Sequence, residues 1–387
     1  YYKINQKEGK FDYITPKAPK GEKPYRFNWQ TPILLSSHNQ DILYMGSEFL
    51  HRSMNQGETW ERISGDLTNG AKEGNVAFGT LTTISESKFQ FGLLYAGSDD
   101  GKIHVSKDGG VSWQLISGNL PQNLWVSRIV ASTHKKERVY ATLNGYRNDI
   151  FESYAYVSED FGATWTSISN GLTEAVNVIV EDSANENILY VGTDNGLFIS
   201  LDKGITWQDF SNGMPKVAIH DAVIQTKAKE LIVGTHGRSI YKMDISKVQE
   251  LTKDVLAKNL HLFKVNDRTK SERWGSQNYA WGKPSEPSQT IWFYSDVDGI
   301  VNVSITNEAG MLVHTQKVEA KKGLNSFAYD YLLSKEVAEK WNKKDKNIKI
   351  KEAENKKFYL PVGKYKMTVS KDKVTETKSF EVTAPKK

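Results

Sequence analysis

Two aspartates have the residue type that hydrolysis of a glycosidic bond requires. That reaction uses two carboxylates that face each other across a cleft, one as the acid and one as the base. Asp149 and Asp221 are the candidates for such a pair. Turn formation for Asp149 and capping of an inner strand for Asp221 are the competing roles. We favour these structural roles and therefore assign no catalytic residue.

Two histidines near Asp221 raise the question of a metal site. His220, Asp221 and His236 fall on predicted neighbouring strands, and imidazole and carboxylate groups are common zinc ligands. Their spacing matches no established ligand pattern, so we favour structural roles for both histidines. The sequence also holds no Ser-His-Asp arrangement, no phosphate loop and no nucleic-acid motif. We predict no metal, no other cofactor and no nucleic-acid partner.

The elements that would position these residues are marked by an eight-residue motif, S-x-D-x-G-x-[ST]-W, which occurs four times. In each copy the side chain of an Asp or Asn is expected to form a hydrogen bond with the backbone two residues later in the chain. The Gly is expected to adopt a positive φ. The Trp is expected to begin the next strand with a large buried surface. We predict a structural role for the four acidic or amide positions and the four tryptophans, which are Asn55, Asp108, Asp160, Asp202, Trp60, Trp113, Trp165 and Trp207.

The motif belongs to a longer repeat that fills residues 24–246. Each unit has an apolar strand, a strand ending in small residues such as Leu189–Thr193, and a strand that runs into the motif. Four short strands in a period of about 45 residues are typical of a β-propeller blade. We predict five blades, the fifth without the motif, in a ring that further blades upstream or in another chain complete.

The rest of the chain follows a different pattern. Residues 1–23 are rich in Lys, Gly and Pro and predict an extended lead-in, and residues 247–260 predict a helical linker. Residues 261–387 alternate apolar and polar positions between turns, as the strands of an Ig-like β-sandwich do. A charged segment that favours helix, 334–357, interrupts these strands. The predicted fold class is therefore all-β, with propeller blades followed by a β-sandwich.

One unit departs from the repeat in a way that points to binding. The third unit carries extra residues between its second strand and its motif, and this stretch is both aromatic and charged. Insertions in a repeat belong to loops, and loops carry binding. Packing on the neighbouring blade is the competing role. We predict a binding face near the central channel, formed by Trp125, Tyr146, Arg147, Asp149, His220, His236 and Arg238.

The motifs and the segments between them resemble known families. The four motifs resemble the Asp-box (BNR) repeats of sialidases, xyloglucanases and sortilin-type receptors. The segments between them resemble large secreted bacterial proteins described as sortilin-like or "glycosyl hydrolase" BNR-repeat proteins. The C-terminal part resembles the Ig-like domain of flagellar hook-capping proteins. The residues that carry the last two resemblances are Trp125–Ser132, Leu143–Asp149, Tyr154–Ser158, Val217–Asp221, Gly234–Arg238, Val303–Gly310, Lys322–Asn325 and Leu360–Tyr365.

The resemblance implies a secreted or cell-surface binding or scaffold protein, located outside the cytoplasm of a bacterium. A protein or peptide partner is expected, as part of an outer-membrane or secretion assembly or as the protein's own upstream half, and a glycan partner is an alternative. The competing function is a glycan-active enzyme, or the non-catalytic half of one. A sialidase is disfavoured because the Arg-Ile-Pro start pattern is missing and the arginines are scattered. The sequence has no cysteine and no apolar run long enough to span a membrane.

Overall fold

A computed structural model describes residues 1–74, 77–211, 213–277, 279, 281–346 and 348–385. The chain divides into two compact units, Tyr1–Gln249 and Glu250–Lys387, and each is considered by itself. No helix in the described part of the chain is both long and apolar enough to cross a membrane.

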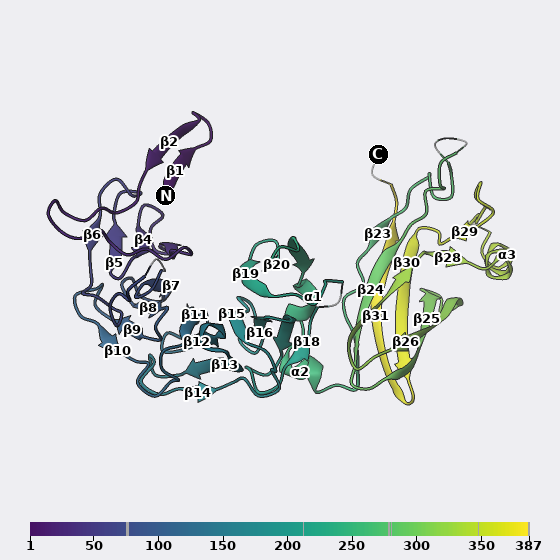
Figure 1. The fold of residues 1–387 in the computed structure, drawn as a ribbon. Coiled ribbons are helices and arrows are strands. Elements are labelled where there is room, and N and C mark those ends of the chain that lie inside the picture. The colour runs from purple at the N-terminus through teal and green to yellow at the C-terminus, as the bar shows by residue number, and fades with distance from the viewer. Residues whose placement is uncertain (75–76, 212, 278, 280, 347, 386–387) are drawn as a thin grey trace. The chain divides into compact units, whose positions relative to one another are not determined.

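Unit 1 consists of antiparallel sheets that follow one another in chain order (Figure 1). Among the described residues, four of them have four strands each, and the last has three because the fifth repeat lacks the motif that precedes a fourth strand. The predicted propeller blades are confirmed. Their strands are β3 Ile33–Leu35, β4 Leu43–Gly46, β5 Leu50–Ser53 and β6 Glu61–Arg62; β7 Leu81–Glu86, β8 Leu94–Ser98, β9 Ile103–Ser106 and β10 Gln114–Leu115; β11 Trp125–Ala131, β12 Val139–Gly145, β13 Ile150–Ser158 and β14 Thr166–Ser167; β15 Val176–Glu181, β16 Leu189–Thr193, β17 Gly196–Ser200 and β18 Gln208–Asp209; β19 Ile219–Gln225, β20 Glu230–Thr235 and β21 Ile240–Asp244.

The second strand of each blade explains how successive blades pack. In the first four blades this strand carries a tyrosine that turns toward the next blade, so that Tyr44 shares a core with Leu81, and Tyr140 shares one with Ile179. The small residue two positions later lets the first strand of the next blade approach closely. A Cβ on Gly97 would lie 2.5 Å from Val126 Cγ1, which is too close for any side chain. The repeat therefore places the first strands side by side, from β3 to β19.

The eight-residue motif forms the same turn in each copy. Asp160 accepts hydrogen bonds from the Ser158 hydroxyl (2.7 Å) and from the Thr164 N–H (2.9 Å), four residues on. The predicted hydrogen bond from the backbone two residues after the aspartate is wrong. Phe161, the residue before Gly162, also adopts a positive φ, so the turn is wider than an Asx turn. The half-buried Trp165 indole donates to Ile116 O of the preceding blade at 2.8 Å. The motif thus closes a turn and links two blades.

Two predicted connecting segments differ from expectation. The predicted extended lead-in contains a hairpin, β1 Tyr2–Asn5 paired with β2 Lys10–Tyr13. The predicted helical linker holds two separate short helices, α1 Ser246–Gln249 and α2 Lys253–Leu256. The α2 helix begins where the Thr252 side chain accepts a hydrogen bond from the Val255 N–H.

Among its described residues, unit 2 has a three-stranded sheet, a five-stranded sheet and a two-stranded pair, which share one hydrophobic core. Within Gly299–Asn307, the core residues Val301, Val303 and Ile305 are separated by exposed or half-buried positions, because one face of that sheet is buried. Within the predicted insertion 334–357, only α3 Lys335–Lys344 is helical among the described residues, and its Trp341 is buried. The Ig-like assignment stays a prediction. The strands are β22 Leu260–Leu262, β24 Gln289–Ser295 and β27 Gly323–Tyr329; β23 Arg268–Thr269, β31 Val374–Thr383, β30 Gly363–Lys371, β25 Gly299–Asn307 and β26 Leu312–Ala320; and the pair β28 Leu332–Leu333 and β29 Phe358–Tyr359.

Candidate functional site

The first strands of the five blades, and the turns beside them, surround a cavity of about 890 Å³, which we call the channel cavity. Ligand sites of this volume are common in proteins. Its wall is aromatic and charged, and it carries both signs of charge. The lining residues are Asn28, Trp29, Gln30, Thr31, Thr82, Trp125, Ser127, Arg128, Asn144, Tyr146, Arg147, Phe151, Asn177, Asp194, Ala218, His220, Asp221 and His236.

The third blade contributes the longest part of this wall. Its extra residues do not form the expected loop but lengthen the β12–β13 hairpin, which ends in a 3₁₀ turn at Tyr146–Asn148. The Arg147 guanidinium lies 4.1 Å from the centre of the Trp125 ring, a cation–π contact. It also lies 3.7 Å from the buried carboxylate of Asp99. The hairpin therefore holds an arginine against an aromatic surface at the cavity wall.

The burial of Asp99 affects its protonation. Burial raises the pKa of the Asp99 carboxyl, and hydrogen bonds from the backbone N–H and the hydroxyl of Thr80 oppose that shift. Arg147 also opposes the shift, because a nearby positive charge favours the carboxylate. Arg147 is thus tied to the second blade as well as to its own hairpin.

A row of polar side chains crosses from the third to the fourth blade. The Asn144 side-chain amide donates to Asn177 Oδ1 at 2.7 Å, and the Asn177 amide donates to Asp194 Oδ1 at 2.8 Å. Asn144 is buried, so its hydrogen bonds fix its orientation in the wall. This row gives the cavity a rigid polar side.

The fifth blade supplies a pair of imidazoles. His220 Nε2 lies 3.1 Å from His236 Nδ1. Burial lowers the pKa of His220, and the neighbouring His236 lowers it further, since two imidazolium ions repel each other. The Asp221 carboxylate is bonded instead to Arg128 at 2.5 Å. In the described residues no three His, Cys, Asp or Glu side chains are grouped so that they could hold a metal ion.

The structure brings together most of the residues predicted to bind. Trp125, Tyr146, Arg147, His220 and His236 all line the channel cavity. Two do not. Asp149 is exposed at the end of the 3₁₀ turn with φ 55°, and Arg238 is exposed in the turn that precedes β21. The pair considered for hydrolysis therefore has one member in the cavity wall, and that member is engaged with Arg128.

Sequence reasoning missed several lining residues, of which Trp29 is the largest. Its side chain is 81% exposed although it lies in the cavity wall. Trp29 comes four residues before β3, in a segment without any repeated pattern. The sequence did hold one signal for Trp29. It is an isolated Trp close to the start of a first strand, as Trp125 is at the start of β11.

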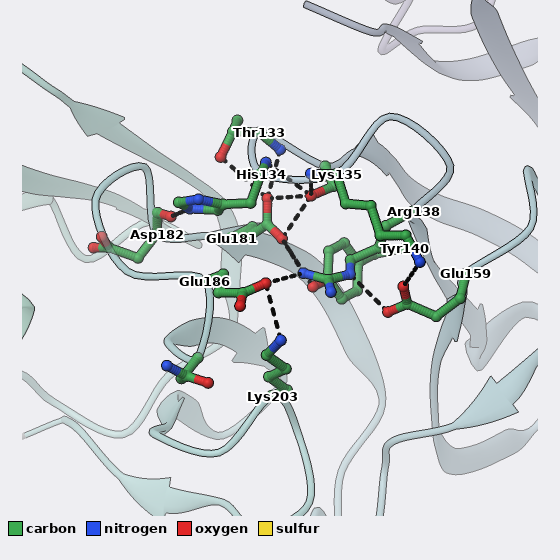
Figure 2. A network of polar contacts seen from close by, with 12 residues as sticks. Thr133, His134, Lys135, Arg138, Tyr140, Glu159, Glu181, Asp182, Glu186 and Lys203 are labelled. Atoms are coloured by element: carbon green, nitrogen blue, oxygen red, sulfur yellow. Dashed lines mark hydrogen bonds and ion pairs between the residues drawn. The ribbon is translucent and has the colours of Figure 1, made fainter. Parts of the chain in front are cut away.

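A second polar cluster lies away from the channel cavity, between the third and fourth blades (Figure 2). The buried Glu181 carboxylate accepts hydrogen bonds from the Ser132 and Tyr140 hydroxyls and lies 3.4 Å from Arg138. Arg138 also bonds Glu159 at 2.7 Å and Glu186 at 3.0 Å. We interpret this cluster as a connection between blades, because every one of its charges has a partner.

The same arrangement occurs between the first and second blades. Glu86, at the end of β7, accepts from the Ser36 hydroxyl at 2.6 Å and from the Tyr44 hydroxyl at 2.9 Å. The shared sequence feature is a Glu that ends the first strand of the next blade. Between the second and third blades that position is Ala131, and the Tyr95 hydroxyl has no partner among the described residues.

Comparison with known proteins finds one matching family model and several similar solved structures. The model of the family described as "Sortilin-Vps10: Sortilin, neurotensin receptor 3," matches residues 48–174. Among curated proteins, none matches the chain. Similar solved structures include an ancestral GH74 enzyme, with 16% identity over 81% of this chain and 40% of that one and a TM-score of 0.45. They also include the Xanthomonas campestris GH74 xyloglucanase, with 11% identity over 92% and 55% of the two chains and a TM-score of 0.45.

A third similar structure is titled YCF48 bound to D1 peptide, with 15% identity, 61% and 68% coverage and a TM-score of 0.42. The chain spans 40% of the length of the ancestral GH74 enzyme and 55% of the Xanthomonas enzyme. The successive antiparallel sheets and the family-model match over residues 48–174 together support a sortilin-like β-propeller.

Proposed function

We propose that the protein binds an extended segment of a partner protein in the channel cavity. The observation that carries this proposal is the wall of that cavity, which joins exposed aromatic rings to arginines and carboxylates from different blades. Trp29, Tyr146 and Phe151 are each about half exposed or more, and exposed apolar residues gathered at one site mark a binding surface. Trp, Tyr and Arg are also the residues that dominate binding energy at protein interfaces.

The polar groups of the cavity favour a polypeptide over hydrolysis of a glycan. An acid and a base for hydrolysis must both be free to exchange protons with the substrate. Asp221 is paired with Arg128, and Asp194 accepts a hydrogen bond from Asn177. Charges of both signs on a rigid wall instead complement a peptide that carries both signs.

Location and assembly form part of the same proposal. We propose that the protein acts outside the cytoplasm of a bacterium, in an outer-membrane or secretion assembly, with unit 2 as an Ig-like docking domain. The resemblance to secreted propeller proteins supports this. Fractionation of cells that express the full-length gene product checks it, and a purely cytoplasmic protein would contradict it.

Binding to arrays tests the channel proposal. One array carries extended twelve-residue peptides and the other carries plant and bacterial oligosaccharides. The double variant Tyr146→Ala with Arg147→Ala should lose at least about ten-fold in peptide affinity, as hot-spot residues do. Its melting temperature should fall by only a few degrees, because neither residue is buried and Asp99 keeps its two hydrogen bonds from Thr80 when Arg147 is removed.

Arg238→Ala is the matched control, since Arg238 is exposed and does not line the cavity. It should bind like the unmodified protein. Equal loss of affinity in both variants, or binding confined to oligosaccharides, contradicts the proposal. Hydrolysis of an oligosaccharide that Asp149→Asn or Asp221→Asn abolishes would establish the enzyme instead.

A further inference from the structure

The N-terminal hairpin has the strand pairing of the outer half of a blade. Tyr2 pairs with Tyr13 and Lys3 with Asp12, just as His51 pairs with Arg62 and Arg52 with Glu61 in the first blade. The two hairpins have the same number of residues between each pair of partners. The segment Phe11–Thr15 also follows the pattern of Trp60–Ser64, an aromatic residue followed three positions later by Ile and then by a hydroxyl residue.

The hairpin contacts the first blade as one blade contacts the next. The Trp60 indole donates to Ile14 O at 2.7 Å, and the Trp113 indole donates to Ile63 O at 2.9 Å. A Cβ on Gly57 would lie 2.9 Å from Ile14 Cβ, and a Cβ on Gly110 would lie 2.8 Å from Ile63 Cβ. Ile14 thus takes the place that Ile63 has at the next interface.

The inner half of this blade is missing from the described residues. In complete blades the third strand pairs with the second as well as with the fourth, yet β1 pairs only with β2 in the part of the chain that the structure describes. Its far edge therefore presents unpaired backbone groups, which is a template for another strand. Tyr2, Ile4, Phe11 and Tyr13 are all more than half exposed.

The facing side of the first blade is uncovered in the same place. Ile33 of β3 is 44% exposed, whereas its counterparts Ile129 and Ile179 are 1% and 0% exposed beneath the preceding blade. Leu35 is 65% exposed at the position where Glu181 is buried. These residues mark a surface shaped for the inner strands of a blade.

We propose that the β1–β2 hairpin is the outer half of a further blade, and that two strands from propeller sequence outside residues 1–387 complete it. The occupant is an apolar strand followed by a strand of the pattern Leu-Tyr-x-Gly, because that strand pairs with the third strand in this chain's own blades. Its tyrosine then packs on Ile33 and Leu35. Addition of strands to an open sheet edge is an established form of recognition. This inference does not depend on the ligand of the channel cavity.

A fusion supplies the missing strands. A copy of residues 79–102, which form the inner half of the second blade, is joined directly before Tyr1 in the full chain. The third strand β9 begins at Ile103, so the junction reproduces the order found in the second blade. Hydrogen exchange of the amides in Tyr2–Asn5 should slow by at least about ten-fold, as it does when strand edges become paired.

The control is the same fusion with Tyr95→Pro and Gly97→Pro in the copied segment, since proline cannot donate in the interior of a sheet. In this control fusion the amides of Tyr2–Asn5 should exchange hydrogen at the same rate as in the unmodified chain. A synthetic peptide of residues 79–102, added to the unmodified chain, is the second arm in case the fusion fails to fold. Equal exchange in both fusions, or no slowing by either arm, overturns the proposal.

Discussion

The tyrosines that face successive blades show how a single atom decides the cost of a substitution. All four are fully or almost fully buried, but their hydroxyls differ in their partners. The Tyr140 hydroxyl donates to Glu181 at 3.0 Å, whereas the Tyr95 hydroxyl has no partner among the described residues. A buried hydroxyl without a hydrogen bond has lost its water without compensation.

Removal of these two hydroxyls should therefore have opposite consequences. Tyr140→Phe should lower the free energy of unfolding by about 1–2 kcal/mol, because it leaves a buried carboxylate short of a donor. Tyr95→Phe should be neutral or slightly stabilising. Urea unfolding of both variants checks this, and an equal loss for the two would show that the hydrogen bond to Glu181 does not set the cost.

The buried arginine between the third and fourth blades makes a second prediction at this scale. Arg138→Met keeps much of the side-chain volume but leaves Glu181 and Glu159 without their guanidinium partner. We expect the free energy of unfolding to fall by about 2–3 kcal/mol. Arg238→Met is the matched control and should change it by less than about 0.5 kcal/mol, because Arg238 is exposed. A similar loss for both would contradict the connecting role of this cluster.

At the scale of the element, the eight-residue motif turns a hairpin and anchors it to the blade before. Its aspartate collects its hydrogen bonds locally, and its indole reaches across to a backbone carbonyl. The motif was predictable from sequence because the residue types recur at fixed spacing. The positive φ of the residue that precedes the glycine was not predictable. The residues at that position, which include Gly109, Phe161 and Lys203, have no type in common.

The motif aspartates give a prediction about acid stability. Hydrogen bonds from the Thr164 side chain and backbone, and from the Ser158 side chain, lower the pKa of Asp160 to about 2. A depressed pKa means that the carboxylate's contribution is full above the unfolded-state pKa near 4 and is lost as pH falls toward 2. Asp160→Asn should make the fall in unfolding free energy between pH 5 and pH 2 shallower.

The first copy of the motif supports the choice of asparagine, because Asn55 Oδ1 accepts from the Thr59 N–H at 2.9 Å. Urea unfolding at several pH values measures the slope. Asp149→Asn serves as the control, since Asp149 is exposed and outside the motifs. The same slope in Asp160→Asn as in the unmodified chain would refute the linkage.

At the scale of the molecule, two units have separate hydrophobic cores. A unit with its own core is expected to fold independently. Residues 250–387 produced alone should unfold cooperatively, within about 3 °C of the corresponding transition in the full chain. Calorimetry of the fragment measures this. A fragment without a cooperative transition would show that unit 2 depends on unit 1.

The candidate site was less predictable than the fold. The repeat identified the third unit as different, and Tyr146 and Arg147 of that unit line the channel cavity. Asp149 does not, because the residues expected to form a loop continue the hairpin and turn its end into solvent. Trp29 was missed because its segment has no period, and only the packing of the blades brings it to the same cavity.

The most direct test of the channel proposal compares two exposed tryptophans. Trp29 lines the channel cavity, and Trp281 of unit 2 is equally exposed but lies outside it. With a peptide selected from the array, Trp29→Ala should weaken binding by at least about ten-fold, and Trp281→Ala should leave it unchanged. Unchanged affinity in Trp29→Ala, or a loss confined to Trp281→Ala, would contradict binding in the channel cavity.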